Sequence, residues 1–256
     1  MANEDAPSPE AFDEVFTQVA AAPRANELFD QVLGPFPAGV EPFSLVPRQG
    51  LDRVLAELRL NPGDQLLDLC CGRGGIGLWF AGVSGARLTG IDFSPAAITQ
   101  ATRRAEAFVP RSSASFMVAD ATATSLPTAA MDAVMCIDAL QLVPDRSGLL
   151  DEIARVLRPG GRLVVTTWER RAGTPGNVPP PYAITDARAL AEAAGLRVLV
   201  REEHDDWQEQ ERMLYRRARA EDSEHAEPAF RMIAEEGRVM LPYSASARRL
   251  LLVATI

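Results

Sequence analysis

Lysine is the residue that this 256-residue sequence lacks altogether, so its 26 basic residues are all arginines. The sequence also has only two histidines and three cysteines. The cysteines, Cys70, Cys71 and Cys136, lie in or beside apolar runs without the spacing of metal ligands, which predicts reduced, buried thiols and no metal site. No apolar run approaches the roughly 20 residues that a membrane helix needs, which argues against a membrane-spanning protein.

Positive charge is also scarce, because 35 acidic residues outnumber the 26 arginines and give a net charge of −9. A strongly acidic chain repels a phosphate backbone at long range, so we expect a small-molecule partner and no nucleic acid. The first residues, Met-Ala-Asn-Glu-Asp, are acidic where a secretory signal would be basic. We therefore expect a cytoplasmic protein.

Residues 1–60 are expected to form an N-terminal helical cap, and residues 61–256 a larger α/β unit within one overall domain. Five of the ten phenylalanines fall in the first 43 residues, and Phe12 and Phe16 are one helical turn apart. Ser44 is placed to cap a following helix. The phenylalanines can form a lid over an apolar ligand or an ordinary helical core, and the sequence leaves both interpretations open.

From residue 65 onward, short apolar runs alternate with helical patterns. Continuous apolar runs indicate strands that are buried on both faces, and the alternation indicates a doubly wound, Rossmann-like, mostly parallel sheet. The expected strands cover residues 65–70, 87–91, 115–118, 133–137, 162–167, 196–200 and 250–256. The expected helices cover residues 75–82, 95–108, 140–142, 145–157, 185–194, 206–219 and 227–236.

A glycine-rich turn follows the first of these strands. Gly72, Gly74 and Gly77 come directly after Asp68 and the strand end, and such a turn lets backbone N–H groups approach a ligand at the positive end of a helix. Asp92 ends the next apolar run, where a carboxylate can accept from both hydroxyls of a ribose. These two signals are common to NAD proteins and nucleoside binders, so they indicate an adenosine-containing cofactor without saying which one.

Five segments in the expected order resemble the motifs of the class I S-adenosylmethionine-dependent methyltransferases, small-molecule branch. They cover residues 67–74, 89–94, 118–127, 131–134 and 157–163. The resemblance implies S-adenosylmethionine as the cofactor and a seven-stranded sheet whose last strand is antiparallel. An NAD-dependent oxidoreductase is less favoured, because a catalytic Tyr-x-x-x-Lys pair needs a lysine.

The resemblance also implies which residues bind the methionine part of the cofactor. Gly72 and Gly74 would face it. Asp68 would bind its ammonium group, and the carbonyl of Ile137 would reach the same group. Asp68 and the glycines can instead serve only the turn.

For the nucleoside part, the resemblance implies that Asp92 accepts from the ribose hydroxyls and that Phe93 lies beside the adenine. Asp120 would accept from the adenine amino group, and Ala121 would supply a backbone N–H. A local role remains open for Asp120, which can cap the loop that follows it.

The sequence defines the catalytic groups least well. Many relatives have a histidine shortly after the fourth strand, whereas this chain has Asp138 and Gln141 there. Asp138 can face the acceptor or cap the short helix behind it, and Gln141 can orient an acceptor but cannot take a proton. His204 is a third candidate, with a charged surface loop as its alternative. Trp168 and Tyr182 can line the acceptor pocket or belong to the core.

The sequence therefore predicts an enzyme that moves a methyl group from S-adenosylmethionine to O, N or C of a small, fairly apolar metabolite, such as a natural-product intermediate. A cyclase or a binding protein with the same fold, which does not methylate, is the alternative, because a fold does not determine a reaction. Assembly into a homo-oligomer stays open.

Overall fold

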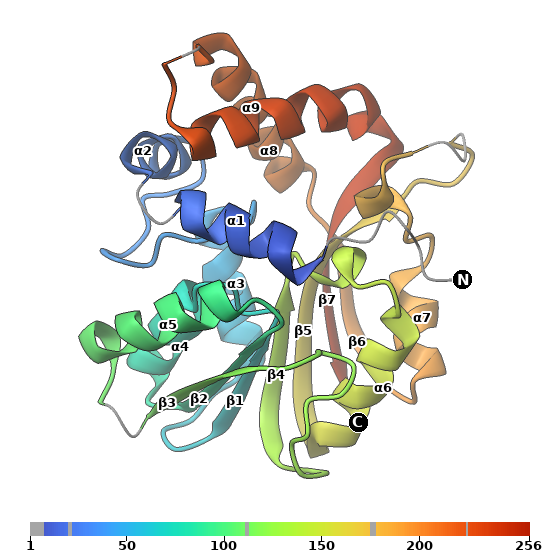
Figure 1. Cartoon of the computed structure of the whole chain (residues 1–256). Helices are drawn as coiled ribbons and strands as arrows, with labels where there is room; N and C mark the ends of the chain where they lie inside the picture. The colour runs from blue at the N-terminus through green and yellow to red at the C-terminus, as the bar shows by residue number, and fades with distance from the viewer. Residues whose placement is uncertain (1–7, 20–21, 111–112, 175–177, 224) are drawn as a thin grey trace.

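A seven-stranded sheet forms the centre of the computed structural model, which describes residues 8–19, 22–110, 113–174, 178–223 and 225–256 (Figure 1). The strand order is β3-β2-β1-β4-β5-β7-β6. Strands β1 to β5 are parallel, and β7 is antiparallel to both β5 and β6, which confirms the predicted fold. The strands are β1 (Gln65–Leu69), β2 (Arg87–Asp92), β3 (Ala114–Val118), β4 (Met131–Ile137), β5 (Leu157–Arg170), β6 (Arg197–Glu203) and β7 (Ala247–Thr255).

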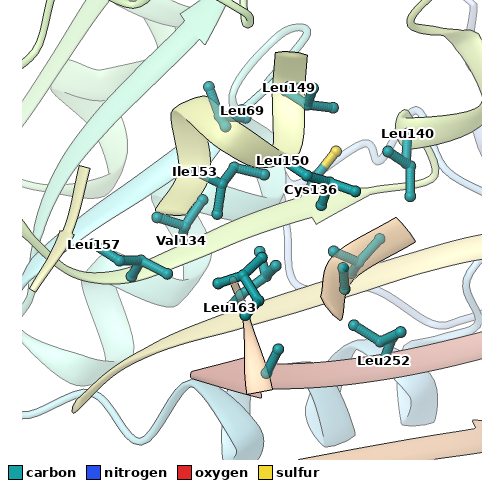
Figure 2. Close-up of a cluster of buried hydrophobic side chains, with 14 of the residues drawn as sticks. Leu69, Val134, Cys136, Leu140, Leu149, Leu150, Ile153, Leu157, Leu163 and Leu252 are labelled. Atoms are coloured by element: carbon teal, nitrogen blue, oxygen red, sulfur yellow. The ribbon is translucent and has the colours of Figure 1, made fainter. Parts of the chain in front are cut away.

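Helices cover both faces of the sheet, as its unbroken apolar strands require. Helices α3 (Arg48–Leu58), α4 (Gly75–Ser84) and α5 (Pro95–Phe108) pack on one face, and α6 (Arg146–Val156) and α7 (Ala187–Ala193) pack on the other. In Figure 2, leucine and isoleucine side chains of α6 lie beside those of β4, and the same cluster continues to Leu163 of β5 and Leu252 of β7. Short 3-10 helices lie at η1 (Leu140–Leu142), η2 (Pro180–Tyr182) and η3 (Leu241–Ser246).

A third group of helices lies over one end of the sheet (Figure 1). It contains α1 (Pro9–Val19), α2 (Pro23–Val32), α8 (Asp205–Glu221) and α9 (Pro228–Met240). Their apolar faces share a core of their own, in which Phe16 and Leu28 from the N-terminal helices join Leu214 and Phe230 from the C-terminal ones. We call these four helices the cap.

The composition of this cap differs from the expectation for residues 1–60. Helix α3 is not part of the cap but packs on one face of the sheet, because Leu51, Val54 and Leu58 are buried against the strands. The C-terminal helices α8 and α9 take its place in the cap. Residues 1–7, which contain the acidic start of the sequence, lie outside the described residues. No helix in the described part of the chain is both long and apolar enough to cross a membrane.

Candidate cofactor and acceptor site

The cap and the ends of the parallel strands enclose a cavity of about 510 Å³. A volume of this size is typical of pockets for small molecules and cofactors. Of the cofactor-binding and catalytic residues proposed from the sequence, those that line the cavity are Asp68, Gly72, Asp92, Phe93, Asp120, Ala121, Ile137, Asp138 and Gln141. The structure thus brings together residues that are as many as 73 positions apart, from Asp68 to Gln141, whereas Gly74 and His204 lie outside the lining.

The glycine turn after β1 holds its shape through left-handed backbone conformations. Gly72 has φ = 52°, and its N–H donates a hydrogen bond of 2.8 Å to Oδ2 of Asp92. Gly74 has φ = 73°, and a Cβ there would lie 2.8 Å from the ring of Phe116. Gly74 therefore serves the turn and its packing, and the prediction that it faces the methionine part of the cofactor stays a prediction.

Asp92 is buried at the end of β2, where its carboxylate holds two loops. Oδ2 accepts from Gly72, and Oδ1 accepts from the N–H of Ser94 at 3.0 Å. Burial raises the pKa of Asp92, although the N–H donors of Ser94 and Gly72 act in the opposite direction. Each carboxylate oxygen keeps room for a further donor on the cavity side.

Asp68 is only 5% exposed, and no cation lies beside it in the described part of the chain. Burial raises the pKa of Asp68 well above its ordinary value, and the charge of Asp92 adds to this effect. A positive ligand group would reverse the effect. Cys70 and Cys71 also line the cavity and are half-buried, so only Cys136 is buried as expected.

Asp120 follows β3 and does local work in the loop, as the alternative interpretation expected. Its Oδ1 accepts from the N–H and from the hydroxyl of Thr122, both at 2.8 Å. The residue is exposed and lines the cavity together with Ala121. Its Oδ2 has no hydrogen bond among the described residues, so it is available to a ligand.

Aromatic side chains of α1 cover the cavity beside Phe93 and Phe43. The rings of Phe12 and Phe93 meet edge to face at 5.3 Å, and the ring of Phe16 lies 5.3 Å from that of Phe43. Asp13 ties α1 to the start of α5 by accepting from the Ser94 hydroxyl and from a backbone N–H. Phe16 belongs to the cap core and also lines the cavity, so the core interpretation is confirmed and the lid over an apolar ligand stays a prediction.

Asp138 is fixed by partners on all sides. Its oxygens accept from the Ser44 hydroxyl at 2.9 Å, from the Thr166 hydroxyl at 2.8 Å and from Arg249 at 2.9 and 3.0 Å. Its side chain does not cap η1. Ser44 does not cap α3 either, because Pro47 is the N-cap and the Ser44 hydroxyl is drawn to Asp138.

Asp138 belongs to a buried charge cluster that contains one cation, Arg249, and a second carboxylate, Glu211. Arg249 is fully buried, pairs with Asp138, and lies 3.6 Å from Glu211. Its guanidinium also stacks on the ring of Trp168 at 3.9 Å, and the indole N–H donates to Glu211 at 2.9 Å. Trp168 lines the cavity, whereas Tyr182 is buried behind it, with its hydroxyl 3.4 Å from Glu211.

Because one guanidinium does not neutralise two carboxylates, Glu211 is the group that takes up a proton. Burial raises the pKa of Glu211 from 4.5 to about 7, and Arg249 only partly offsets this. The folded protein therefore binds this proton more tightly than the unfolded chain does. The stabilising contribution is fully present below the unfolded pKa of 4.5 and is lost as the pH rises through about 7.

We expect the Glu211→Gln substitution to flatten the pH dependence of stability. In the wild type, this one group lowers the free energy of unfolding by about 3 kcal/mol between pH 4.5 and 7, since one pKa unit corresponds to about 1.4 kcal/mol. Urea titrations at several pH values measure the slope. Glu209→Gln, on the exposed side of the same helix, is the control, and equal slopes in Glu211→Gln and wild type would contradict this account.

The other two catalytic candidates have structural partners. Gln141 lines the cavity, donates to the Asp138 carbonyl at 2.5 Å and accepts from the Thr167 hydroxyl at 2.9 Å. His204 stacks on Trp207 with ring centroids 3.8 Å apart and lies outside the cavity lining. His204 follows β6, the outermost strand on its side of the sheet, so the structure does not bring it to the cavity, and its catalytic role stays a prediction.

Sequence reasoning missed two groups in the cavity, Glu236 and Tyr215. Glu236 lies on the same face of α9 as Ile233 and Met240, three residues after one and four before the other. A carboxylate in register with the apolar face of a helix is a signal that the sequence contains. The expected helix ended at residue 236, so the apolar residue beyond it was not included in the face.

Comparison with known proteins finds a methyltransferase domain at residues 66–161, the segment that contributes most of the strand-end lining. The 2-methyl-6-phytyl-1,4-hydroquinone methyltransferase of Synechocystis sp. is 39% identical over 112 residues, which are 44% of this chain and 34% of that protein. The matching segment thus spans about a third of the length of this relative.

Two solved structures have a similar fold over nearly the whole chain. The [4+2]-cyclase SpnF has a TM-score of 0.74 at 22% identity, and the match covers 98% of this chain and 96% of that one. Phosphoethanolamine N-methyltransferase 2 of Haemonchus contortus, in complex with S-adenosyl-L-methionine, has a TM-score of 0.75 at 18% identity, over 95% of this chain and 59% of that one. Residues 66–161 thus form a methyltransferase domain, and the two solved structures show that the whole chain has the same fold.

Proposed function

We propose that this protein transfers a methyl group from S-adenosylmethionine to a small, fairly apolar metabolite, such as a natural-product intermediate. The observation that carries the proposal is a single cavity in which carboxylates at the strand ends face an apolar chamber under the cap. The domain match at residues 66–161 supports the donor, and the chamber supports the kind of acceptor.

The charges of the strand-end half suit a cationic cofactor. Asp68, Asp92 and Asp120 line it, and S-adenosylmethionine carries positive charge on its sulfonium and ammonium groups. Negative groups that lose stability through burial regain it when a cation binds beside them. An ammonium group would give Asp68 the cationic partner that it lacks in the described part of the chain, and the carbonyl of Ile137 would accept from the same group.

The contacts with the rest of the cofactor follow from which protein donors and acceptors are free to bind it. Asp92 would accept from both ribose hydroxyls, because each of its oxygens uses one lone pair on a backbone N–H. Asp120 would accept from the adenine amino group through Oδ2, with the N–H of Ala121 beside it and Phe93 against the ring. Gly72, which lines the cavity, would lie along the methionine part.

The acceptor half of the cavity is apolar. Phe12, Phe29, Met232, Ile233 and Met240 line it, and all five belong to the cap. We propose that α1 acts as a lid, with Asp13 and Phe12 as the contacts that hold it closed. A closed lid excludes water and holds the acceptor in line with the methyl group, and such positioning supplies much of the rate of a displacement reaction.

Asp138 and Gln141 would shape the floor beneath the reacting groups. The ion pair of Asp138 with Arg249 and the two hydrogen bonds of Gln141 hold both side chains in fixed places. Fixed polar groups orient an acceptor without reorganisation during the reaction. We propose a positioning role for both residues. We also propose a cytoplasmic location, which the three free cysteines favour.

The mass of the product tests the reaction. The full chain is incubated with S-adenosylmethionine and a set of apolar hydroxyl and amino compounds, and the products are analysed by mass spectrometry. We expect a product heavier than its acceptor by one CH₂ unit, together with S-adenosylhomocysteine. The solved [4+2]-cyclase has this fold over its whole length, so an intramolecular reaction is the second candidate. A product of unchanged mass would favour it and overturn methyl transfer.

A further inference from the structure

A carboxylate without a cationic partner faces the apolar chamber. Glu236, on α9, lines the cavity and is exposed. Glu236 forms no ion pair among the described residues. Its neighbours on the same helix face, Ile233 and Met240, are buried and apolar, so nothing on α9 compensates its charge.

The other carboxylates that line the cavity either pair with an arginine or lie at the strand ends, away from the apolar chamber. Asp138 is bound by Arg249, and Glu41 is bound by Arg73 at 2.7 Å. The remaining ones are Asp68 near the end of β1, Asp92 at the end of β2 and Asp120 after β3, where the nucleoside and amino acid parts of the cofactor would lie. Only Glu236, among the acidic residues that line the cavity, comes from the cap side without a basic partner among the described residues.

Tyr215 of α8 accompanies Glu236. Its hydroxyl is buried, makes no hydrogen bond of standard geometry with the described residues, and lies close enough to Glu236 for each group to perturb the other. The absence of a side chain at residue 237 permits this approach, because a Cβ there would lie 2.9 Å from Cβ of Tyr215. Burial raises the pKa of both groups.

We propose that Glu236 is the general base of the reaction, that Tyr215 holds its carboxylate in position, and that the acceptor is an apolar molecule with a neutral hydroxyl group. This proposal rests on the proposed methyl transfer. The acceptor oxygen bonds to the methyl carbon while the bond from that carbon to sulfur breaks, and the electron pair stays on sulfur. The hydroxyl proton moves to a carboxylate oxygen of Glu236, which becomes a neutral acid. One positive and one negative charge are thereby lost together.

The surroundings of Glu236 favour this chemistry. Besides Tyr215, the titratable groups that face it are Glu211 and Tyr182 behind the chamber wall and Asp138 after β4, and the charge of Asp138 raises its pKa further. A base with a raised pKa takes a proton more effectively near neutral pH. A hydroxyl acceptor enters an apolar chamber as a neutral group, whereas an ammonium group must first lose its hydration.

The first test needs no acceptor. S-adenosylmethionine and S-adenosylhomocysteine differ by one positive charge at sulfur, so a carboxyl group beside that sulfur releases more protons when the former binds. Calorimetric titrations between pH 5 and 7, in buffers of different ionisation enthalpy, measure this release. We expect wild type and Glu235→Gln to release more protons on binding S-adenosylmethionine than on binding S-adenosylhomocysteine. We expect Glu236→Gln to show no such difference. Glu235 is the matched control, because it lies on the outer face and pairs with Arg238.

The outcomes of this test separate the role of Glu236 from the proposed methyl transfer. A difference that persists in Glu236→Gln, or no difference in wild type, would overturn the proposal for Glu236 while methyl transfer stands. Failure of both compounds to bind to any variant would overturn the proposed function itself.

The second test uses 4-substituted phenols of graded acidity as acceptors, with aliphatic amines of similar size as the comparison. We expect Glu236→Gln to slow methylation of weakly acidic phenols by roughly 10²–10⁴-fold while binding S-adenosylhomocysteine as wild type does. The loss should shrink for phenols that are already ionised, because these need no base. Equal rates in Glu236→Gln and wild type would overturn the base assignment. Transfer to amines but to no phenol would overturn the acceptor class.

Discussion

Asp92→Ala should weaken the binding of S-adenosylhomocysteine by more than about 100-fold, the largest effect that we expect from a single substitution on ligand affinity. A hydrogen bond to a charged group contributes about 1.5–3 kcal/mol, and Asp92 would make two with the ribose. The substitution also leaves the N–H groups of Gly72 and Ser94 without their acceptor, so the glycine turn becomes less ordered. Isothermal titration calorimetry measures the affinity directly.

The control for this experiment is Asp132→Ala. Asp132 lies at the start of β4, away from the cavity, and its carboxylate accepts from the backbone N–H of Gln65 at 2.7 Å. This substitution removes the same kind of contact and should leave the affinity unchanged. An equal loss of affinity in the two variants would mean that Asp92 acts through stability and not through the ribose.

Arg249→Met should lower the free energy of unfolding by about 3–5 kcal/mol, because removing one partner of a buried ion pair leaves the other charge uncompensated. Arg249 is fully buried, pairs with Asp138 through two contacts and lies near Glu211. It is the only cation that these two carboxylates contact in the described part of the chain. Urea denaturation at constant pH measures the loss.

The double variant Arg249→Met/Asp138→Asn separates the ion pair from the packing of the arginine. An Asn side chain accepts from one of the hydroxyls of Ser44 and Thr166 and can donate its NH₂ group to the oxygen of the other, so the neutral pair should lose clearly less stability than the sum of the two single losses. Additive losses would show that the two charges do not stabilise each other. The cluster would then contribute only through its packing.

The sheet and its cofactor edge could be predicted from the sequence because their signals are local. Helix α5 begins at Pro95 and ends at Phe108, as its pattern predicts, since Ser94 caps it and proline starts it. The strand ends carry Asp68, Asp92 and Asp120 into one cavity, because the carboxyl ends of parallel strands meet at one edge.

The acceptor half could not be predicted, because it is assembled from segments that are distant in the sequence. Arg249 on β7 meets Asp138 after β4 across 111 residues, and no local pattern signals such a pair. His204 ends a strand and resembles a site residue by position, yet β6 is the outermost strand on its side of the sheet. The cap joins helices from both ends of the chain, and only this packing brings Glu236 to the cavity.

A crystal structure of the full chain with S-adenosylhomocysteine tests the central claim most directly. We predict the ligand in the cavity, with its ribose hydroxyls on Asp92, its ammonium group beside Asp68 and its sulfur turned toward the apolar chamber under α9. Clear density for the ligand at another place on the molecule, or a ribose that makes no contact with Asp92, would contradict the account.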